Sequence, residues 1–216
     1  MNRADAEILW EAASVLARDA AKVSRTRGRM GPNLPPLLFF TDPERTLRPW
    51  ETAARLPVGA GVVFRHFGHA NARETALRLR EATRSRDGLL LIGLDADLAD
   101  AIGADGVHLP ERALDQAAAL AAARPDWRIT GAAHSRVALA TAGLDALVVS
   151  PVFPAGGASA SRPALGLAVL QAWVEAAPCP VYALGGIDGG NANSLNGSGV
   201  CGLAGVSAIQ AAFGPA

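Results

Sequence analysis

Short apolar runs alternate with amphipathic segments along most of this chain. The apolar runs have the length and the aliphatic content that are typical of buried parallel strands. We predict eight strands, over residues 37–41, 61–65, 89–93, 105–109, 128–132, 146–150, 181–184 and 200–205. Apolar residues at helical spacing lie between most of these strands, in residues 70–85, 113–123, 135–142 and 164–177. Strands that alternate with helices in this number predict an α/β fold, a closed (β/α)8 TIM barrel.

The first 36 residues follow a different pattern. Residues 4–24 carry apolar side chains at helical spacing, with charged residues on the opposite face, and predict an amphipathic helix. Glycines and prolines between Gly28 and Pro36 predict a linker. We therefore divide the chain into a helix with its linker, residues 1–36, and a barrel, residues 37–216. The apolar stripe of the helix needs a partner surface, which is either the flank of the barrel or a second subunit in a homodimer.

Composition and charge narrow the class of protein. The 216 residues are 50% hydrophobic and 19% charged, which is typical of one globular domain with a large core. Twenty basic residues balance twenty acidic ones, which argues against a nucleic acid or an anionic membrane as a partner. No apolar run has the roughly 18 residues that cross a bilayer, and the first residues lack the order of a secretory signal. We therefore expect a cytoplasmic protein, in which Cys179 and Cys201 are buried apolar side chains rather than a disulfide or metal ligands.

The last two predicted strands end in a way that indicates an anion site. Residues 181–184 run into Gly185-Gly186, and residues 200–205 are followed by Val206 and by Ser207, which begins a short apolar helix. In (β/α)8 barrels the loops after strands 7 and 8 frequently bind phosphate, and free N–H groups at the start of a helix favour an anion. The alternative is structural: Gly-Gly is then a tight turn and Ser207 an ordinary helix cap.

The carboxyl ends of the other strands carry polar side chains suited to chemistry. These ends form the active face of such a barrel, and the residues found there are Thr41, Asp42, Arg65, His66, His108, His134, Ser135 and Ser150. His134 is the candidate acid and base, because imidazole can remove and return a proton near neutral pH; a structural hydrogen bond is the alternative. Arg65 ends an apolar strand and needs an anionic partner, either Asp42 or a ligand. His108 alternates with apolar neighbours, and for it we expect a structural role.

Two further segments have competing interpretations. Residues 155–163 are rich in Gly, Ser and Ala and follow the sixth strand on the active face, so they are either a lid or an idle mobile loop. Asp95, Asp97 and Asp100 lie together in the first turns of a predicted helix. Acidic side chains at that place fit helix capping better than metal binding.

Five motifs of the chain, taken in order, resemble those of the thiamine phosphate synthase and TenI family, a set of (β/α)8 barrels of thiamine biosynthesis. They are Phe39-Phe40-Thr41-Asp42, Gly103-Ala104-Asp105-Gly106-Val107-His108-Leu109, Ser150-Pro151-Val152-Phe153-Pro154, Ala183-Leu184-Gly185-Gly186-Ile187 and Val206-Ser207-Ala208-Ile209. The resemblance covers about residues 37–210 and leaves out the N-terminal helix. It implies that Gly185, Gly186, Val206 and Ser207 hold the phosphate of a thiazole substrate.

The synthase branch of the family joins this thiazole phosphate to a hydroxymethylpyrimidine diphosphate and releases pyrophosphate, with Mg²⁺ held by acidic residues. This chain departs from that branch at the charged positions. Phe67 stands where the family has a lysine, Gly93-Leu94 where it has Asn-Asp, and Ala113 where it has a metal-binding Asp; Arg162 is the only cation in residues 155–163. Each charge pair is worth about 4 kcal/mol at about 4 Å when the effective dielectric constant is about 20. These losses therefore argue against efficient release of pyrophosphate.

The TenI branch is the closer resemblance. Its members isomerise a carboxythiazole phosphate to the aromatic form, which requires one phosphate site, no metal and a histidine after strand 5. The segment Gly131-Ala132-Ala133-His134-Ser135 matches, with Ala132 in place of a family serine. The resemblance thus implies a tautomerase that binds a phosphorylated thiazole without a cofactor. In it His134 moves the proton, Arg65 meets the substrate carboxylate, and Thr41, Ser135 and Ser150 bind substrate.

Two alternatives to the tautomerase stay open. One is a synthase with a rearranged Mg²⁺ site. The other is a barrel that binds a thiazole phosphate in a regulatory or scaffolding role without catalysis, because a (β/α)8 fold does not by itself fix a function.

Overall fold

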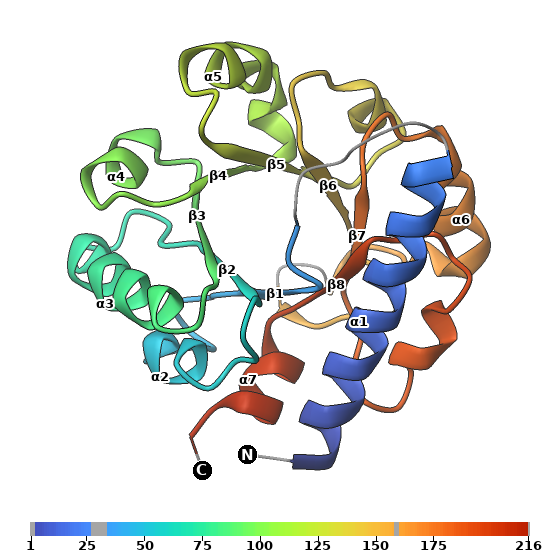
Figure 1. Ribbon diagram of the computed structural model, residues 1–216, viewed down its shortest axis with the longest axis horizontal. Coiled ribbons are helices and arrows are strands. Elements are labelled where there is room, and N and C mark those ends of the chain that lie inside the picture. Colours follow the sequence, from blue (N-terminus) through green and yellow to red (C-terminus); the bar gives the residue numbers. More distant parts are fainter. Residues whose placement is uncertain (1–2, 27–33, 158–159, 216) are drawn as a thin grey trace.

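The computed structural model describes residues 3–26, 34–157 and 160–215. Its eight strands are parallel and pair in chain order, and β1 closes the barrel by pairing with β8 (Figure 1). The strands are β1 (Leu37–Phe40), β2 (Gly61–Phe64), β3 (Leu89–Gly93), β4 (Gly106–Leu109), β5 (Arg128–Ala133), β6 (Ala146–Val149), β7 (Val181–Leu184) and β8 (Gly202–Gly205). This architecture confirms the predicted (β/α)8 TIM barrel.

Alternation along the strands gives the barrel two apolar layers. In β1, Leu38 and Phe40 belong to an inner cluster that includes Val148 of β6, while Leu37 and Phe39 belong to the outer core beneath the helices. Side chains on both faces of β1 are buried. Burial on both faces explains why these strands are continuous apolar runs in the sequence rather than alternating ones.

Helices cover the outside of the barrel and follow one another around it in Figure 1. The α-helices are α1 (Arg3–Thr26), α2 (Pro49–Ala53), α3 (Ala72–Arg84), α4 (Ala96–Ala101), α5 (Ala117–Ala123), α6 (Gly166–Ala176) and α7 (Ser207–Phe213), and the 3₁₀ helices are η1 (Glu111–Gln116), η2 (Val137–Ala140) and η4 (Ala192–Leu195). Within the described ranges, no helix is both long enough and apolar enough to span a membrane.

Three of the four helices predicted between strands are confirmed with shifted ends, the one over 113–123 being divided between η1 and α5. The helix predicted over 135–142 is wrong, because only the single 3₁₀ turn η2 forms there. Thr141 already has extended backbone with ψ of 126°, and Gly143 has a φ of +81°. So short an apolar run cannot propagate a helix past these residues.

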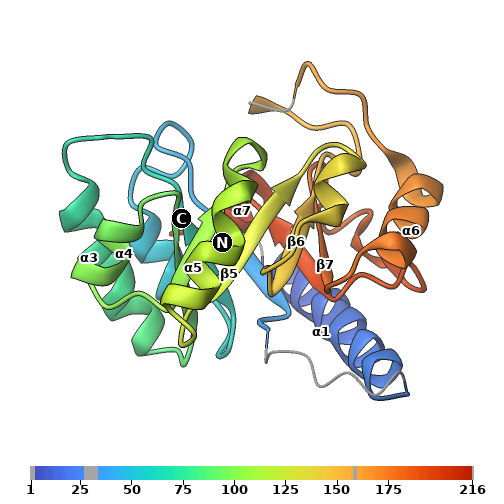
Figure 2. The same cartoon turned by 90° about the horizontal axis from the view of Figure 1, so that it is seen from above.

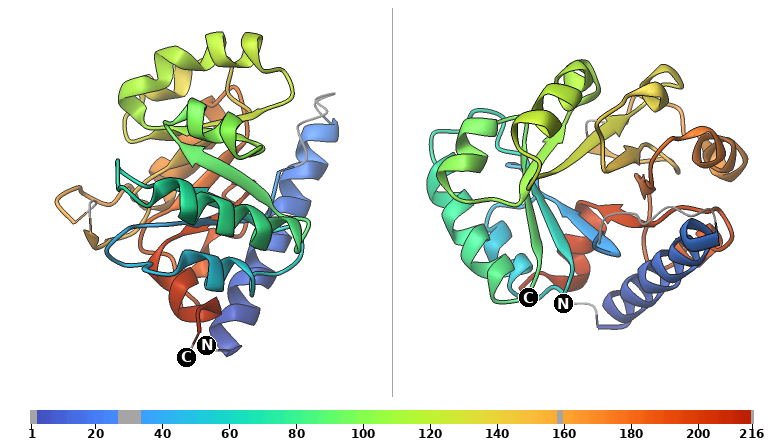
Figure 3. Two further views of the ribbon diagram at one scale, coloured as in Figure 1. Left: turned by 90° about the vertical axis from the view of Figure 1, so that its left-hand side faces the viewer. Right: turned by 45° about the horizontal axis from the view of Figure 1, so that its top comes forward.

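The N-terminal helix α1 packs on the flank of the barrel. Between β7 and β8 the chain forms only the short η4. Helix α1 lies against η4, β8 and α7, and fills the space between α6 and α7 (Figures 1 and 3). Its apolar stripe, Leu9, Ala12, Ala13 and Leu16, is at most 2% exposed. Of the two partner surfaces expected from the sequence, the barrel's own flank is therefore occupied; the homodimer stays a prediction, and the linker residues 27–33 lie outside the described part.

We expect Leu9→Ala, at a side chain that is 2% exposed, to lower the free energy of unfolding by about 2–5 kcal/mol, because it leaves a cavity between α1 and the barrel. The matched control is Leu77→Ala in α3, where the side chain is 48% exposed; there we expect about 0.5 kcal/mol or less. Urea unfolding measures both. Equally small effects of the two substitutions would contradict the packing of α1 into the core.

The connection from β6 to α6 stands out from the barrel on the side away from α1 (Figure 2). It includes the segment predicted to be a lid, residues 155–163, of which residues 158–159 lie outside the described part. Gly156 and Gly157 are exposed. The closing motion of a lid stays a prediction.

Candidate active site

A cavity of about 910 Å³ opens at the carboxyl ends of the strands. Its apolar walls include Phe40, Phe67, Leu94, Val148 and Leu184. The polar and charged side chains that line it are Arg65, His66, Asp95, Asp97, His108, Arg112, His134, Ser150 and Arg162. A concave, largely apolar space of this size with a few polar groups is typical of a site for a small molecule.

His134 follows β5, and its ring is held by Ser150 at the end of β6. Nδ1 of His134 lies 2.9 Å from the carbonyl oxygen of Ser150 and 3.2 Å from the Ser150 hydroxyl oxygen. Because a carbonyl oxygen can only accept a hydrogen bond, Nδ1 carries the proton in the neutral ring. Nε2 then keeps a free lone pair, and the side chain lines the cavity. A general base awaiting a substrate proton has this arrangement.

Sequence reasoning missed Glu111, which fixes the segment around His134. Its carboxylate accepts hydrogen bonds from the backbone N–H of His134 and, at 2.5 Å, from the hydroxyl of Ser135. Burial alone would raise the pKa of Glu111, but these hydrogen bonds hold the pKa below its usual value, so the carboxylate is charged at neutral pH. Ser135 is thus tied to Glu111 rather than lining the cavity. The only signal in the sequence is an acidic residue placed two positions after the strand predicted over 105–109.

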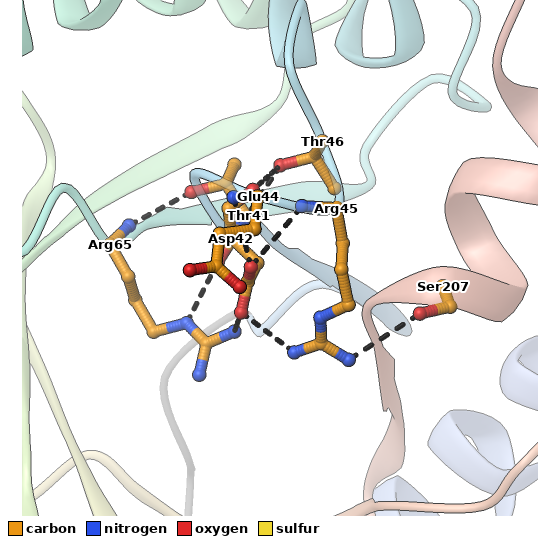
Figure 4. A network of polar contacts seen from close by, with 7 residues as sticks. All are labelled: Thr41, Asp42, Glu44, Arg45, Thr46, Arg65 and Ser207. Atoms are coloured by element: carbon orange, nitrogen blue, oxygen red, sulfur yellow. Dashed lines mark hydrogen bonds and ion pairs between the residues drawn. The ribbon is translucent and has the colours of Figure 1, made fainter. Parts of the chain in front are cut away.

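Arg65, just beyond β2, is held by Thr41 at the end of β1. The Arg65 backbone N–H donates to Thr41 Oγ1 at 2.9 Å, and Arg65 Nε donates to the Thr41 carbonyl at 2.8 Å (Figure 4). The guanidinium carbon lies 5.4 Å from the ring centre of Phe40 and 5.6 Å from that of Phe67. Burial lowers the pKa of Arg65 to about 10, although the charge of Asp42 acts in the opposite direction, so the side chain stays cationic at neutral pH. Thr41 is itself buried beneath the cavity lining and supports Arg65.

Both anionic partners expected for Arg65 remain compatible with its geometry. Asp42 is one of them, with Oδ2 lying 3.8 Å from Arg65 Nη2. That distance is too long for a hydrogen bond, and Nη2 is a buried donor without a hydrogen-bond partner among the described residues. A carboxylate that enters the cavity could therefore satisfy it.

Arg45 is a second residue that sequence reasoning missed. It lies in the loop between β1 and α2, donates from Nη2 to Asp42 Oδ2 at 2.7 Å, and reaches Ser207 Oγ with Nη1 at 3.4 Å (Figure 4). The hydrogen bond from Arg45 holds the pKa of Asp42 below its usual value, so the carboxylate is charged at neutral pH. Arg45 therefore connects the Asp42 and Arg65 pair to the turn after β8.

The four residues expected to bind phosphate lie in the turns after β7 and β8, outside the lining of the cavity. Gly185 and Gly186 have φ values of +100° and +67°, and a Cβ on Gly186 would lie 2.5 Å from the Pro154 carbonyl oxygen. The Gly-Gly pair is therefore needed for a tight turn, as the structural alternative expected. Val206 takes the N-cap position of α7 and Ser207 is the first helical residue, so the alternative in which Ser207 is the helix cap is wrong.

His108 is a buried residue of the cavity lining. Its Nδ1 is 2.9 Å from Thr130 Oγ1, and its ring meets Phe40 edge-on with the ring centres 4.9 Å apart. Burial lowers the pKa of His108 to about 3, so the ring is neutral at physiological pH. These contacts agree with the structural role expected for it, although the ring also lines the cavity.

Asp95, one of the two acidic residues that line the cavity with Asp97, is engaged in capping a helix. Asp95 Oδ1 accepts a hydrogen bond from the Leu98 N–H at 2.8 Å and caps α4, as predicted. Its other oxygen lies 3.3 Å from His66 Nε2, while His66 Nδ1 accepts a hydrogen bond from the Gly68 N–H. In the described residues, no three His, Cys, Asp or Glu side chains come together in a way that could hold a metal ion.

Comparisons with known proteins agree on one family. The family model described as thiamine monophosphate synthase matches residues 41–209. A thiamine-phosphate synthase of Archaeoglobus fulgidus is 35% identical over 82% of this chain and 86% of its own length. A thiamine biosynthesis bifunctional protein of Symbiobacterium thermophilum is 37% identical over 66% of this chain, which spans only 30% of that relative's length.

A solved structure agrees with these sequence matches. The thiamine phosphate pyrophosphorylase of Pyrococcus furiosus superposes with a TM-score of 0.67 and 26% identity, over 84% of this chain and 93% of that one. The superposition shows the shared (β/α)8 barrel, and the sequence matches show membership of the family. This chain therefore belongs to the thiamine monophosphate synthase family, an enzyme family of thiamine biosynthesis.

Proposed function

We propose that the protein is a metal-independent thiazole phosphate tautomerase, which isomerises a carboxythiazole phosphate to its aromatic form by acid–base catalysis at His134. The observation that supports this most is the state of the His134 ring. Nδ1 donates to the Ser150 carbonyl at 2.9 Å, which leaves the lone pair of Nε2 for a substrate in the cavity. A tautomerisation can run on one such group, because the proton taken from one carbon is returned to another.

The isomerisation needs no second reactant. His134 Nε2 takes a proton from one carbon of the substrate, and the electron pair of that C–H bond enters the conjugated system. The imidazolium then returns the proton to a second carbon, so that the product is an isomer of the substrate. The charged carboxylate of Glu111, bound to the backbone of His134, stabilises the imidazolium while it exists.

Arg65 is suited to the carboxylate of the substrate. It is cationic, stands beside two aromatic rings at the cavity wall, and has a buried Nη2 without a hydrogen-bond partner in the described part of the chain. An arginine in this state binds a carboxylate strongly because the hydrogen bonds are charge-assisted. The phosphate is assigned to the turns of Gly185, Gly186, Val206 and Ser207, from the family resemblance.

The cavity offers few protein ligands for Mg²⁺, on which the synthase reaction depends: among the described residues no three His, Cys, Asp or Glu side chains come together. Magnesium requires oxygen ligands in near-octahedral geometry. The acidic side chains that line the cavity are Asp95 and Asp97, and one oxygen of Asp95 already accepts a hydrogen bond from the N–H of Leu98. We therefore propose a reaction without a metal or another cofactor.

The alternative is a thiamine phosphate synthase, and two observations favour it. The Archaeoglobus relative reported above carries that name, and the matching family model is described as thiamine monophosphate synthase. In addition, Arg112 and Arg162 line the cavity, and each adds a cation that could meet a diphosphate in place of the missing lysines. The synthase would then hold the diphosphate mainly by arginines rather than through a metal.

A calorimetric titration separates the two functions. We expect thiazole phosphate to bind without Mg²⁺. We expect Mg²⁺ to change the affinity for hydroxymethylpyrimidine diphosphate little, because Asp95 and Asp97 are the carboxylates in the cavity lining and one oxygen of Asp95 caps α4. Conversion of carboxythiazole phosphate, followed by the absorbance of the aromatic product, then tests catalysis directly. Mg²⁺-dependent binding of the diphosphate, with formation of thiamine phosphate, would establish the synthase instead. Binding of the ligands without either conversion would support the third alternative, a barrel that binds thiazole phosphate without catalysis.

A further inference from the structure

One carboxylate on the active face is shared by two arginines. Asp42 Oδ2 lies 2.7 Å from Arg45 Nη2 and 3.8 Å from Arg65 Nη2, and Figure 4 shows the carboxylate between the two guanidinium groups. Two positive charges thus face one negative charge. Asp42 alone cannot neutralise both, so the cluster keeps a surplus positive charge at the carboxyl end of β1.

Arg45 extends from this cluster to two other loops of the active face. Nη1 of Arg45 is 3.4 Å from the hydroxyl oxygen of Ser207, after β8. On another side, Gly157 in the connection after β6 packs so closely that a Cβ there would lie 2.8 Å from the guanidinium carbon of Arg45. The Arg45 side chain keeps 30% of its surface exposed. It is therefore enclosed by three loops and still within reach of a ligand.

We propose that Arg45 binds the phosphoryl group of the substrate and sets the preference for a phosphorylated ligand, while Asp42 holds its guanidinium in place. This inference rests on the proposed function, which places the phosphate at the turns that include Ser207. Those turns supply backbone N–H groups and a hydroxyl, but no formal charge. A phosphate dianion is held more strongly when a guanidinium adds charge-assisted hydrogen bonds.

The geometry of Arg45 leaves a donor for this purpose. Nη2 is committed to Asp42 at 2.7 Å, which fixes the orientation of the planar group. Nη1 meets Ser207 at 3.4 Å, a distance longer than that of a usual N–H···O bond, so this contact is weak and a phosphate oxygen beside Ser207 can replace it.

The two arginines then serve opposite ends of one substrate. Arg65 lines the cavity and donates from Nε to the Thr41 carbonyl, which suits it to the carboxylate end. Arg45 lies outside the cavity lining, beside Ser207, which suits it to the phosphate end. Asp42 between them keeps the guanidinium groups apart and fixes their separation.

The test compares two ligands that differ only in the phosphate: thiazole phosphate and the thiazole alcohol. Calorimetry gives the Kd of each for the wild-type protein and for Arg45→Gln. We expect the wild-type protein to prefer the phosphate. Arg45→Gln should raise the Kd for the phosphate by about 10- to 100-fold, the usual value of a hydrogen bond to a charged group. The Kd for the alcohol should not change. Arg45→Lys should give a Kd for the phosphate between those of the wild type and Arg45→Gln. It is also the variant to measure if Arg45→Gln does not fold.

The matched control is Arg48→Gln, which removes the same charge from the same loop. Arg48 is 65% exposed and pairs with Glu51 at 2.9 Å, so we expect no change in either Kd. An unchanged phosphate preference in Arg45→Gln and Arg45→Lys, or an equal loss in Arg48→Gln, would overturn the role of Arg45 and leave the proposed function standing. A wild-type protein that binds both ligands equally would overturn the phosphate site and the role of Arg45 together, whereas turnover of carboxythiazole phosphate decides the proposed function separately.

Discussion

His134→Gln is expected to lower the turnover of carboxythiazole phosphate by about 10²- to 10⁴-fold, the usual contribution of a general acid–base residue. Glutamine can still hydrogen-bond to Ser150, which now holds the His134 ring at 2.9 Å, but it cannot take up and return a proton. The affinity for thiazole phosphate should change little, because the groups assigned to the carboxylate and the phosphate lie on other strands. A fall in turnover at constant Kd is therefore the signature of proton transfer at this residue.

The matched control is His69→Gln, the same change at an exposed histidine outside the cavity lining, for which turnover should stay at the wild-type value. The measurement is the rate of aromatic product formation under saturating substrate, with the Kd of thiazole phosphate taken from calorimetry. A His134→Gln enzyme that keeps the wild-type rate would rule out His134 as the catalytic base. A parallel loss of binding and rate would instead assign the ring to substrate positioning.

The barrel could be predicted from the sequence because parallel strands buried on both faces appear as short, continuous apolar runs. Leu37–Phe40 and Val181–Leu184 are such runs. The surface against which helix α1 packs could not be predicted in the same way. Its stripe of Leu9, Ala13 and Leu16 requires a partner, but an apolar stripe carries no information about which surface covers it. The gap that α1 fills exists because the chain between β7 and β8 forms only η4.

Some residues of the site could be predicted from the sequence and others could not. His134, Arg65 and Ser150 could be named because every parallel strand of a barrel brings its carboxyl end to one face. Arg45 could not, because its contact with Ser207 joins positions 162 residues apart and depends on the path of the loop after β1. Glu111 was missed for the same reason, since its hydrogen bonds to the segment of His134 follow from the turn that opens η1.

We expect acidification from pH 7 to pH 5 to lower the free energy of unfolding by about 2 kcal/mol through the protonation of His108 alone. Burial lowers the pKa of His108 to about 3 in the folded protein, with the charges of Arg65 and His134 acting in the same direction. The unfolded chain has the ordinary histidine pKa of about 6.5. Between about pH 6.5 and pH 3 the unfolded state therefore binds a proton that the folded state does not, so stability rises with pH and is lost as the solution is acidified.

Urea unfolding of the wild-type protein and of His108→Gln at several pH values between about 5 and 7 tests this expectation. The substitution also removes the 2.9 Å hydrogen bond to Thr130 and the ring contact with Phe40, whose centre lies 4.9 Å from that of His108. The absolute stability should therefore fall at every pH. The informative quantity is the slope of the free energy of unfolding against pH. Below pH 6 this slope should be smaller in the variant than in the wild type, by up to about 1.4 kcal/mol per pH unit. His69→Gln, at an exposed ring, should keep the wild-type slope. Equal slopes for wild type and His108→Gln would mean that the folded protein protonates His108 as readily as the unfolded chain does, and would contradict the lowered pKa.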